Sequence, residues 1–221
     1  MPKAVKGGRP YESPRRREQA EATRRAILKA AQRLFEQSGY GATSVPAIAE
    51  EAGVALKTVY VAFETKARLL RVLWETRLGA DEANVAVTER AWYRELLEEP
   101  DPERQLRLVA AQGRVVKTRS GALMEVIRNA ASGDAEISRL WNDIQSKLLD
   151  VQRLIVEQLY EKSALAEGLD RATAADILWT LNHPSVWQLL VAQRGWTAGQ
   201  YERWLGDSFC MQLLQGAKSR A

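Results

Sequence analysis

Lys57, Thr58 and Tyr60 lie within four residues of one another, and all three carry side chains that donate hydrogen bonds. Such donors can bind the oxygens of a phosphate group, and a lysine can also reach the edge of a guanine base. The two preceding residues, Ala55 and Leu56, are uncharged, and small side chains at that end permit close approach to a groove. The spacing therefore indicates contact with phosphates and bases rather than covalent chemistry.

The rest of the chain offers little for an enzyme. His183 is the single histidine and Cys210 the single cysteine, so the sequence holds no Cys/His cluster for zinc. It also lacks a Gly-x-Ser-x-Gly elbow and a glycine-rich phosphate loop. We therefore expect no catalytic residue, no metal and no cofactor. A lone cysteine cannot form an internal disulfide, which fits a reducing cytoplasm.

The donors lie on a segment typical of two short helices, ATSVPAIAEEAGVALKTVYVAFETK, residues 42–66. Ser44 is a good N-cap, and Pro46 falls in the first turn, where a missing backbone N–H costs nothing. Gly53 ends the first helix, and the second is expected over about 56–63. A helix, a tight turn and a short helix form a helix–turn–helix. The residues expected to lock its angle are Ile48, Ala49, Val54, Val59 and Phe63.

Further phosphate contacts are expected around this segment. Thr43 and Ser44 lie at a helix N-terminus, whose free N–H groups suit a phosphate, and Lys66 begins the next helix. Residues 1–75 carry 14 Lys and Arg against 8 Asp and Glu, whereas the remainder carries 18 against 20. A basic arm, expected to be flexible over residues 1–19, on a basic domain is typical of a polyanion-binding protein. A solvated tail would explain the same charges.

Helical periodicity predicts an all-α chain. An irregular connector is expected over about 79–99, and Pro184 should kink one helix near Asn182. No uncharged apolar run is long enough to predict a membrane-spanning helix. The helices are expected over about 21–37, 44–52, 56–63, from 66 onward, and over about 101–117, 122–131, 135–161, 171–194 and 197–215.

The last two helices carry large apolar residues on more than one face and need cover on two sides. One side can be the core of the chain and the other a second copy, which predicts a homodimer. A fully interior hairpin is the alternative. The residues concerned are Ile177, Leu178, Leu181, Val186, Leu189, Leu190, Tyr201, Trp204, Leu205, Phe209, Leu213 and Leu214.

Three pieces of the run 23–70 resemble the N-terminal domain of the TetR/AcrR family of transcriptional regulators. They are ILKAAQRLFEQSGYGATSV, IAEEAGV and TVYVAFETKARLL, and their order, spacing and residue types agree with the family. The resemblance implies a DNA-binding head over residues 20–65. It also implies an all-α ligand-binding and dimerisation body over residues 66–221.

Carried over by position, the resemblance implies that one set of residues contacts DNA. Three positions depart from the family: Ala55 replaces a frequent serine cap, Lys57 a frequent glycine, and Ala62 a frequent aromatic residue or histidine. A DNA preference particular to this chain is expected at these positions. The implied DNA-contacting residues are Thr43, Ser44, Ala55, Leu56, Lys57, Thr58, Tyr60 and Lys66.

All seven tryptophans lie in the predicted body. Aromatic walls with a few polar groups suit a mostly apolar or aromatic small molecule, whereas core or dimer packing would explain each tryptophan equally well. The kink favours Asn182 and His183, because a freed carbonyl there can serve a ligand. The candidate ligand-binding residues are Trp92, Asn129, Trp141, Trp179, Asn182, His183 and Trp187.

The expected function is that of a homodimeric, sequence-specific DNA-binding regulator in the cytoplasm. It would act as a repressor that a small, mostly apolar or aromatic effector releases from a palindromic operator. The alternative is a helical interaction module that binds an acidic protein or a membrane through the basic arm. A cryptic enzyme is a third hypothesis, and the lone histidine is its main obstacle.

Overall fold

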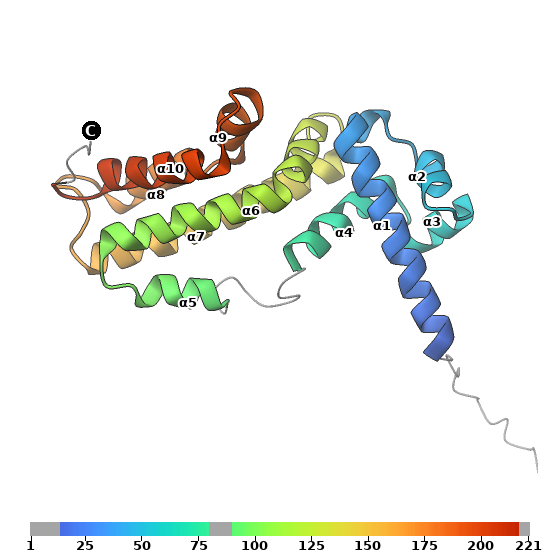
Figure 1. Ribbon diagram of the computed structural model, residues 1–221, viewed down its shortest axis with the longest axis horizontal. Coiled ribbons are helices and arrows are strands. Elements are labelled where there is room, and N and C mark those ends of the chain that lie inside the picture. The colour runs from blue at the N-terminus through green and yellow to red at the C-terminus, as the bar shows by residue number, and fades with distance from the viewer. Residues whose placement is uncertain (1–13, 80–89, 217–221) are drawn as a thin grey trace, which may run out of the picture.

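The computed structural model describes residues 14–79 and 90–216, to which all structural statements refer. These residues form helices throughout, apart from one isolated bridge between Leu165 and Leu214. The predicted all-α fold is therefore confirmed. The molecule is elongated, with the N-terminal helices at one end and the C-terminal helices at the other (Figure 1). Within the described ranges, no helix is long and apolar enough to cross a membrane.

The head contains α1 (Pro14–Ala42), α2 (Val45–Glu51) and α3 (Leu56–Phe63), and α4 (Lys66–Gly79) follows at the start of the predicted body. The expected flexible arm is wrong in its last part, because residues 14–19 already belong to α1. Pro14 fits the first turn of a helix, and no glycine or further proline interrupts the polar residues after it. Residues 1–13 of the arm lie outside the described residues. Gly39 departs from helical geometry near the end of α1, with φ 77°.

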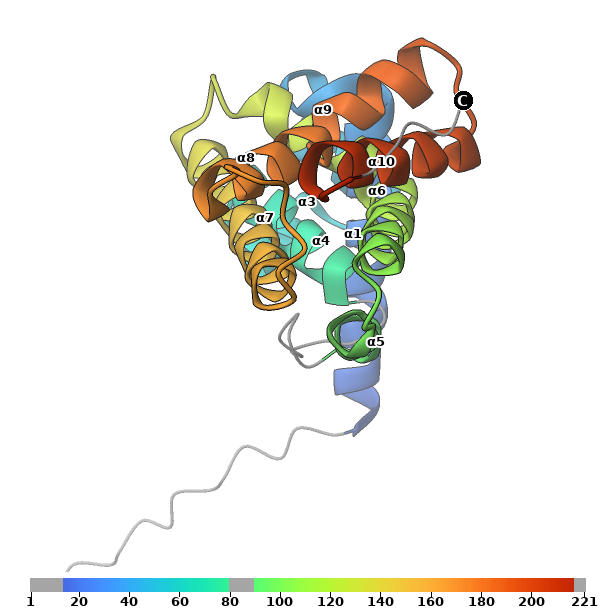
Figure 2. The ribbon, with the colours of Figure 1, turned by 90° about the vertical axis from the view of Figure 1, so that its left-hand side faces the viewer.

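The body contains α5 (Ala91–Glu98), α6 (Pro102–Ala130), α7 (Ala135–Glu161), α8 (Arg171–Leu181), α9 (Pro184–Trp187), a π-helical turn (Gln188–Gln193) and α10 (Ala198–Leu213). In Figure 2 the long helices α6 and α7 are seen nearly end-on, with α8 and α10 lying across them. Asp101, Asp134, Asp170 and Thr197 are the N-caps of α6, α7, α8 and α10, and the side chain of each accepts a backbone N–H.

Two expectations for the body are wrong. Residues 91–98 of the expected irregular connector form α5, whose Tyr93 and Leu96 are buried; residues 80–89 lie outside the described residues. The two helices expected between residues 101 and 131 are one continuous helix, α6. Ser120 and Leu123 are buried at the expected break, so packing holds the helix together where local propensity is weak.

The expected kink near Asn182 is a full break. α8 ends at Leu181, and His183 caps the short α9 with its side chain, which accepts the backbone N–H of Ser185 at 3.2 Å. The backbone then continues as the π-helical turn, a rare conformation that often marks functional positions.

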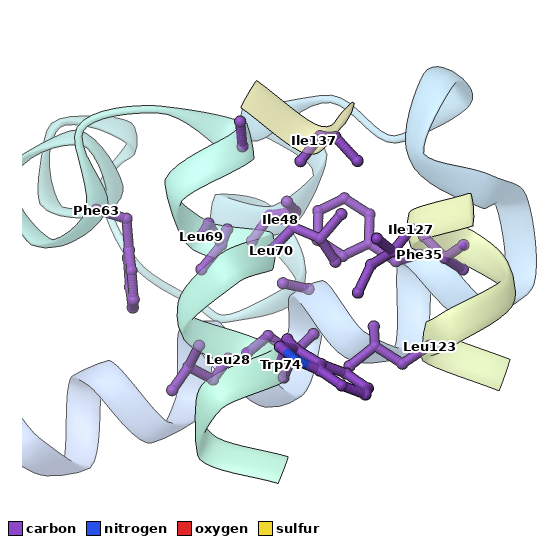
Figure 3. Close-up of a cluster of buried hydrophobic side chains, with 14 of the residues drawn as sticks. Leu28, Phe35, Ile48, Phe63, Leu69, Leu70, Trp74, Leu123, Ile127 and Ile137 are labelled. Atoms are coloured by element: carbon purple, nitrogen blue, oxygen red, sulfur yellow. The ribbon is translucent and has the colours of Figure 1, made fainter. Parts of the chain in front are cut away.

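The head is joined to the body by shared packing. One buried cluster contains Phe35 of α1 and Leu70 of α4 together with Leu123 and Ile127 of α6 and Ile137 of α7. Figure 3 shows Phe35, Leu70, Trp74, Leu123 and Ile127 pointing toward one another. A second cluster fills the far end of the body between α5, α6, α7, α8 and α10. The head is therefore not separated from the body by a solvated linker.

Candidate nucleic-acid interface and ligand cavity

The α2–α3 pair has the geometry of a helix–turn–helix. Ser44 caps α2 by accepting the backbone N–H of Ala47 at 3.2 Å. Gly53, with φ 66°, makes the turn, and Val54 N then donates to Ala49 O at 3.0 Å. α3 begins at Leu56 without a side-chain cap, as expected from Ala55.

α3 buries one side and exposes the other. Val59 and Phe63 are each 2% exposed, whereas Tyr60 is 47% and Val61 76% exposed. Ala55, Leu56 and Lys57 are also exposed, and Thr58 is half-buried. The exposed side therefore carries hydrogen-bond donors beside apolar surface. Apolar side chains can contact a thymine methyl group, and donors can bind phosphates or base edges.

Two of the residues expected to hold phosphates have internal roles instead. Thr43 is only 3% exposed, and its hydroxyl donates to Gly39 O at 2.8 Å. Lys66 Nζ donates to Tyr40 O at 2.8 Å and to Thr43 O at 3.0 Å, and lies 4.1 Å from the centre of the Tyr40 ring. Both side chains stabilise the end of α1, where the chain leaves helical geometry and frees carbonyl oxygens. Ser44 remains exposed.

Sequence reasoning missed the brace between α1 and α3. The Arg24 guanidinium donates to Ala62 O at 3.1 Å and stacks over the Phe63 ring at 4.5 Å. Arg24 entered the sequence analysis only in the count of basic residues over 1–75, and no local spacing links it to a residue 38 positions away. A second link joins Arg33 of α1 to Glu51 of α2 in an ion pair.

The expected ligand residues fall into three groups. Trp141 and Trp179 both make edge-on contacts with His183, with ring centres 6.1 and 5.0 Å away, so α7, α8 and the break meet in one aromatic cluster. Asn129 and Trp187 line a cavity between the head and the body. Trp92 stands apart from both groups on α5, where it packs edge-on against Tyr93.

Asn182 has a partner that the sequence did not suggest. Its side-chain oxygen accepts a hydrogen bond from Lys117 of α6. Lys117 is 5% exposed, lies over the Tyr201 ring at 5.5 Å, and also lines the cavity. Burial lowers the pKa of Lys117 to about 7, because an interior site disfavours the charged form.

A link between head and body borders the same cavity. The Tyr40 hydroxyl donates to Asp134 Oδ2 at 2.9 Å, and Asp134 also caps α7 by accepting the N–H groups of Glu136 and Ile137. Burial alone would raise the pKa of Asp134, but these hydrogen bonds and Lys66 together lower it. Burial and Asp134 raise the pKa of Tyr40, so its hydroxyl stays protonated and can donate.

Comparison with known proteins agrees with this geometry. Residues 27–73 match the family model described as bacterial regulatory proteins of the tetR family. The HTH-type transcriptional regulator AcrR of Shigella flexneri is 27% identical over 200 residues, which cover 86% of this chain and 81% of that protein. These matches support the predicted resemblance to regulators of the TetR/AcrR family. The expectation of a regulator rather than an enzyme is thereby confirmed.

Two solved structures of regulatory proteins share the fold. NalD, the secondary repressor of the MexAB-OprM multidrug efflux pump in Pseudomonas aeruginosa, superposes with a TM-score of 0.67 at 22% identity, covering 89% of this chain and 98% of NalD. FadR of Bacillus subtilis in complex with stearoyl-CoA gives a TM-score of 0.66 at 20% identity, covering 84% of this chain and 96% of FadR. At these identities the likeness confirms the fold alone.

Proposed function

We propose that the protein is a homodimeric transcriptional repressor that binds a palindromic operator through α3 and is released from it by a small effector. The observation that carries the proposal is the exposed side of α3, which presents Lys57, Tyr60 and Val61 on a short helix held at a fixed angle. A short helix of this kind reaches base edges in the major groove, while its neighbours bind phosphates.

Support for a repressor comes from named relatives. The AcrR relative is a transcriptional regulator, and NalD is described as a repressor. Such a protein would act on DNA in the cytoplasm. Effector binding is supported by the cavity between head and body, because a ligand there would contact α1 and α6 together. The protein would have two conformations that differ in the position of the head. A ligand that binds one conformation more tightly shifts the equilibrium toward it, and DNA shifts the equilibrium toward the other.

The homodimer has less support than the sequence suggested. Tyr201, Leu205, Phe209 and Leu213 of α10 are fully buried against their own chain, so they are not free to contact a second copy. The apolar surface left near the last helices comes from Met211 and Leu189, which are 50% and 52% exposed. We propose that this surface joins the two copies, so that two α3 helices meet two half-sites of one operator.

The test is fluorescence anisotropy with DNA selected by the full-length protein from a random pool, and with the DNA upstream of its own gene. We expect binding that is sequence-selective and that weakens as salt rises, because cations are released from the phosphates. Binding without sequence preference, or none at all, would overturn the proposal. If deletion of residues 1–13 abolishes binding while α3 variants leave it unchanged, the interaction-module alternative is correct.

A further inference from the structure

The cavity between head and body has a volume of about 880 Å³. Its walls come from the end of α1, from the second half of α6 with the following turn, and from α9 with the π-helical turn. α9 and the end of α1 lie on the same side of α6 (Figure 1). This volume is in the range of pockets that hold small organic molecules. Of its lining residues, Phe35, Lys117 and Val126 are buried.

The charged residues around the cavity differ in their exposure and in their bonding partners. Glu36 is exposed, Glu125 is bonded to Arg128 and Asn129, and Asp134 is bonded to Tyr40. Lys117 is the buried charge among the lining residues. Within the described part of the chain it has no carboxylate partner, only the neutral Asn182 oxygen and the face of the Tyr201 ring.

Other groups near Lys117 do not neutralise it. Burial lowers the pKa of His183, and the nearby Lys117 and Arg128 lower it further, so His183 is neutral at pH 7. Burial raises the pKa of Tyr201, so the phenol is neutral as well. An ammonium buried among neutral groups costs free energy, which an anion at the same place would offset.

The sequence of α6 makes room for this arrangement. Gly113, Lys117 and Gly121 follow one another at intervals of four residues, and so lie on one face of the helix. A Cβ atom at Gly113 would lie 2.7 Å from Asn182 Oδ1 and 3.3 Å from Lys117 Nζ. A Cβ atom at Gly121 would lie 3.3 Å from Trp187 Nε1. The glycines therefore let Asn182 and Trp187 approach α6 on either side of the lysine.

We infer that this cavity binds a small aromatic acid, with its acidic group paired to Lys117 and its ring packed against Trp187. The inference rests on the proposed function in treating this acid as the effector. The same cavity is also lined by Tyr40 and Asp134, whose hydrogen bond joins α1 to α7.

Calorimetric titration of the full-length protein without DNA tests the binding site. The probes are matched pairs that differ in charge alone: 1-naphthoate with 1-naphthamide, 2-naphthoate with 2-naphthamide, and indole-3-acetate with its amide. We expect the acid of at least one pair to bind about tenfold or more tightly than its amide, since a buried charge pair is stronger than a neutral contact. Lys117→Met should remove this preference, whereas Lys147→Met, at an exposed position on α7, should keep it.

Two results would overturn the inference. One is equal or absent binding of acid and amide throughout the panel, and the other is an acid preference that persists in the Lys117→Met protein. If Lys117→Met fails to fold, as judged by thermal unfolding, Lys117→Gln takes its place. The acid preference of the unaltered protein is itself a test that needs no variant.

The pH dependence gives a second measurement. The probe acids stay ionised above pH 6, while Lys117 loses its charge as pH rises through about 7. A bound anion favours the charged amine, so binding above this pH takes up a proton. The dissociation constant should therefore rise by up to about tenfold per pH unit between pH 7 and 9. In the Lys117→Met protein it should be constant, and an unchanged slope there would contradict the inference.

A separate assay with the selected operator distinguishes the two proposals. The acid that binds most tightly in the titration should release the unaltered protein from DNA but leave the Lys117→Met protein bound. Operator binding without any acid preference would overturn the ligand inference alone. An acid preference without operator binding would overturn the proposed function alone.

Discussion

Lys57 and Lys66 show how surroundings give two uses to the same kind of side chain. Lys57 is exposed on α3, beside Tyr60 and Val61. The ammonium of Lys66 is held by two carbonyl oxygens of the α1 end and by the Tyr40 ring, and its pKa is lowered by burial. The exposed lysine is available to DNA, and the other holds the head together.

Lys57→Ala should weaken binding to the selected operator by about 1–3 kcal/mol if the ammonium contacts a base edge. Anisotropy with operator and with scrambled DNA measures the loss, which should be smaller for the scrambled sequence. Lys147→Ala on α7 is the matched control, because that lysine is equally exposed but lies on the body. Unchanged operator affinity in Lys57→Ala would contradict the assigned contact.

Lys66→Met should lower the stability of the protein rather than its contacts with phosphates, contrary to the expectation from the sequence. Loss of the ammonium leaves the carbonyl oxygens of Tyr40 and Thr43 without this donor. The free energy of unfolding, measured with urea, should therefore fall by about 1–3 kcal/mol. The slope of operator affinity against salt should stay the same, because no phosphate contact is lost. A slope reduced by about one unit, with stability unchanged, would restore the phosphate assignment.

Lys117→Met should stabilise the protein, most strongly at or below about pH 7. The pKa of Lys117 is lowered to about 7 by burial, whereas that of an unfolded lysine is about 10.4. Between these values the unfolded chain binds the extra proton, so the stability of the unaltered protein rises with pH relative to the variant. Urea unfolding between about pH 6 and 9 measures the free energy of unfolding of both proteins. The advantage of the variant should shrink by up to about 1.4 kcal/mol per pH unit above 7. A difference independent of pH would contradict the burial of a titrating amine.

At the scale of elements, the connection between α1 and α7 depends on one turn. α6 ends at Ala130 and α7 begins at Ala135, so Asp134 presents its carboxylate to Tyr40 while it caps α7. Local patterns predicted that α7 begins at residue 135, because the residues that start a helix act within a few positions. They did not predict the bond between Tyr40 and Asp134, which joins residues 94 positions apart.

Tyr40→Phe should loosen this connection without disturbing either helix. We expect the free energy of unfolding to fall by about 1–2 kcal/mol, since Asp134 keeps its backbone partners and loses one charge-assisted hydrogen bond. The loss should be the same at pH 5 and pH 8. The pKa of Asp134 is lower in the folded protein than in the unfolded chain. The hydrogen bond therefore contributes its full stability at any pH above the ordinary pKa of an aspartate. That contribution is lost only when stronger acid protonates Asp134. Equal stability of the variant and the unaltered protein would show that the Tyr40–Asp134 hydrogen bond does not contribute to stability.

At the scale of the whole molecule, the head is at one end of an elongated chain and α10 covers α6 at the other (Figure 1). A dimer joined near α10 would contain two heads that move with their own α6 and α7. Bivalent contact then makes operator affinity depend on dimerisation, since two weak half-site contacts act together.

Met211→Glu should convert the dimer to monomer in sedimentation velocity and weaken operator binding by an order of magnitude or more. A charge placed in an apolar interface is costly to bury, which is the physical reason. Leu154→Glu is the matched control, because Leu154 is 44% exposed but belongs to α7 rather than to the proposed interface. A monomeric parent protein, or a dimer that tolerates Met211→Glu, would contradict this interface.

The sequence by itself determined the helices that end at glycines and begin at capping residues, and the inward side of α3. These features depend on neighbours within one or two turns, such as Ser44, Gly53, Val59 and Phe63. The resemblance to the TetR/AcrR family came from the same local spacing. The sequence was less reliable where packing overrides local preference, as in the continuous α6 across Ser120 and Gly121.

Only the tertiary structure decided which polar residues are available. Thr43 and Lys66 are committed inside the head, Arg24 braces α3, and Lys117 is buried in the body. Thr43 bonds to Gly39 nearby in the chain, whereas Lys66, Arg24 and Lys117 each depend on a partner that the fold brings from a distant segment. A side chain's type limits the bonds it can form, but its burial and its partners decide whether it serves the fold or a ligand.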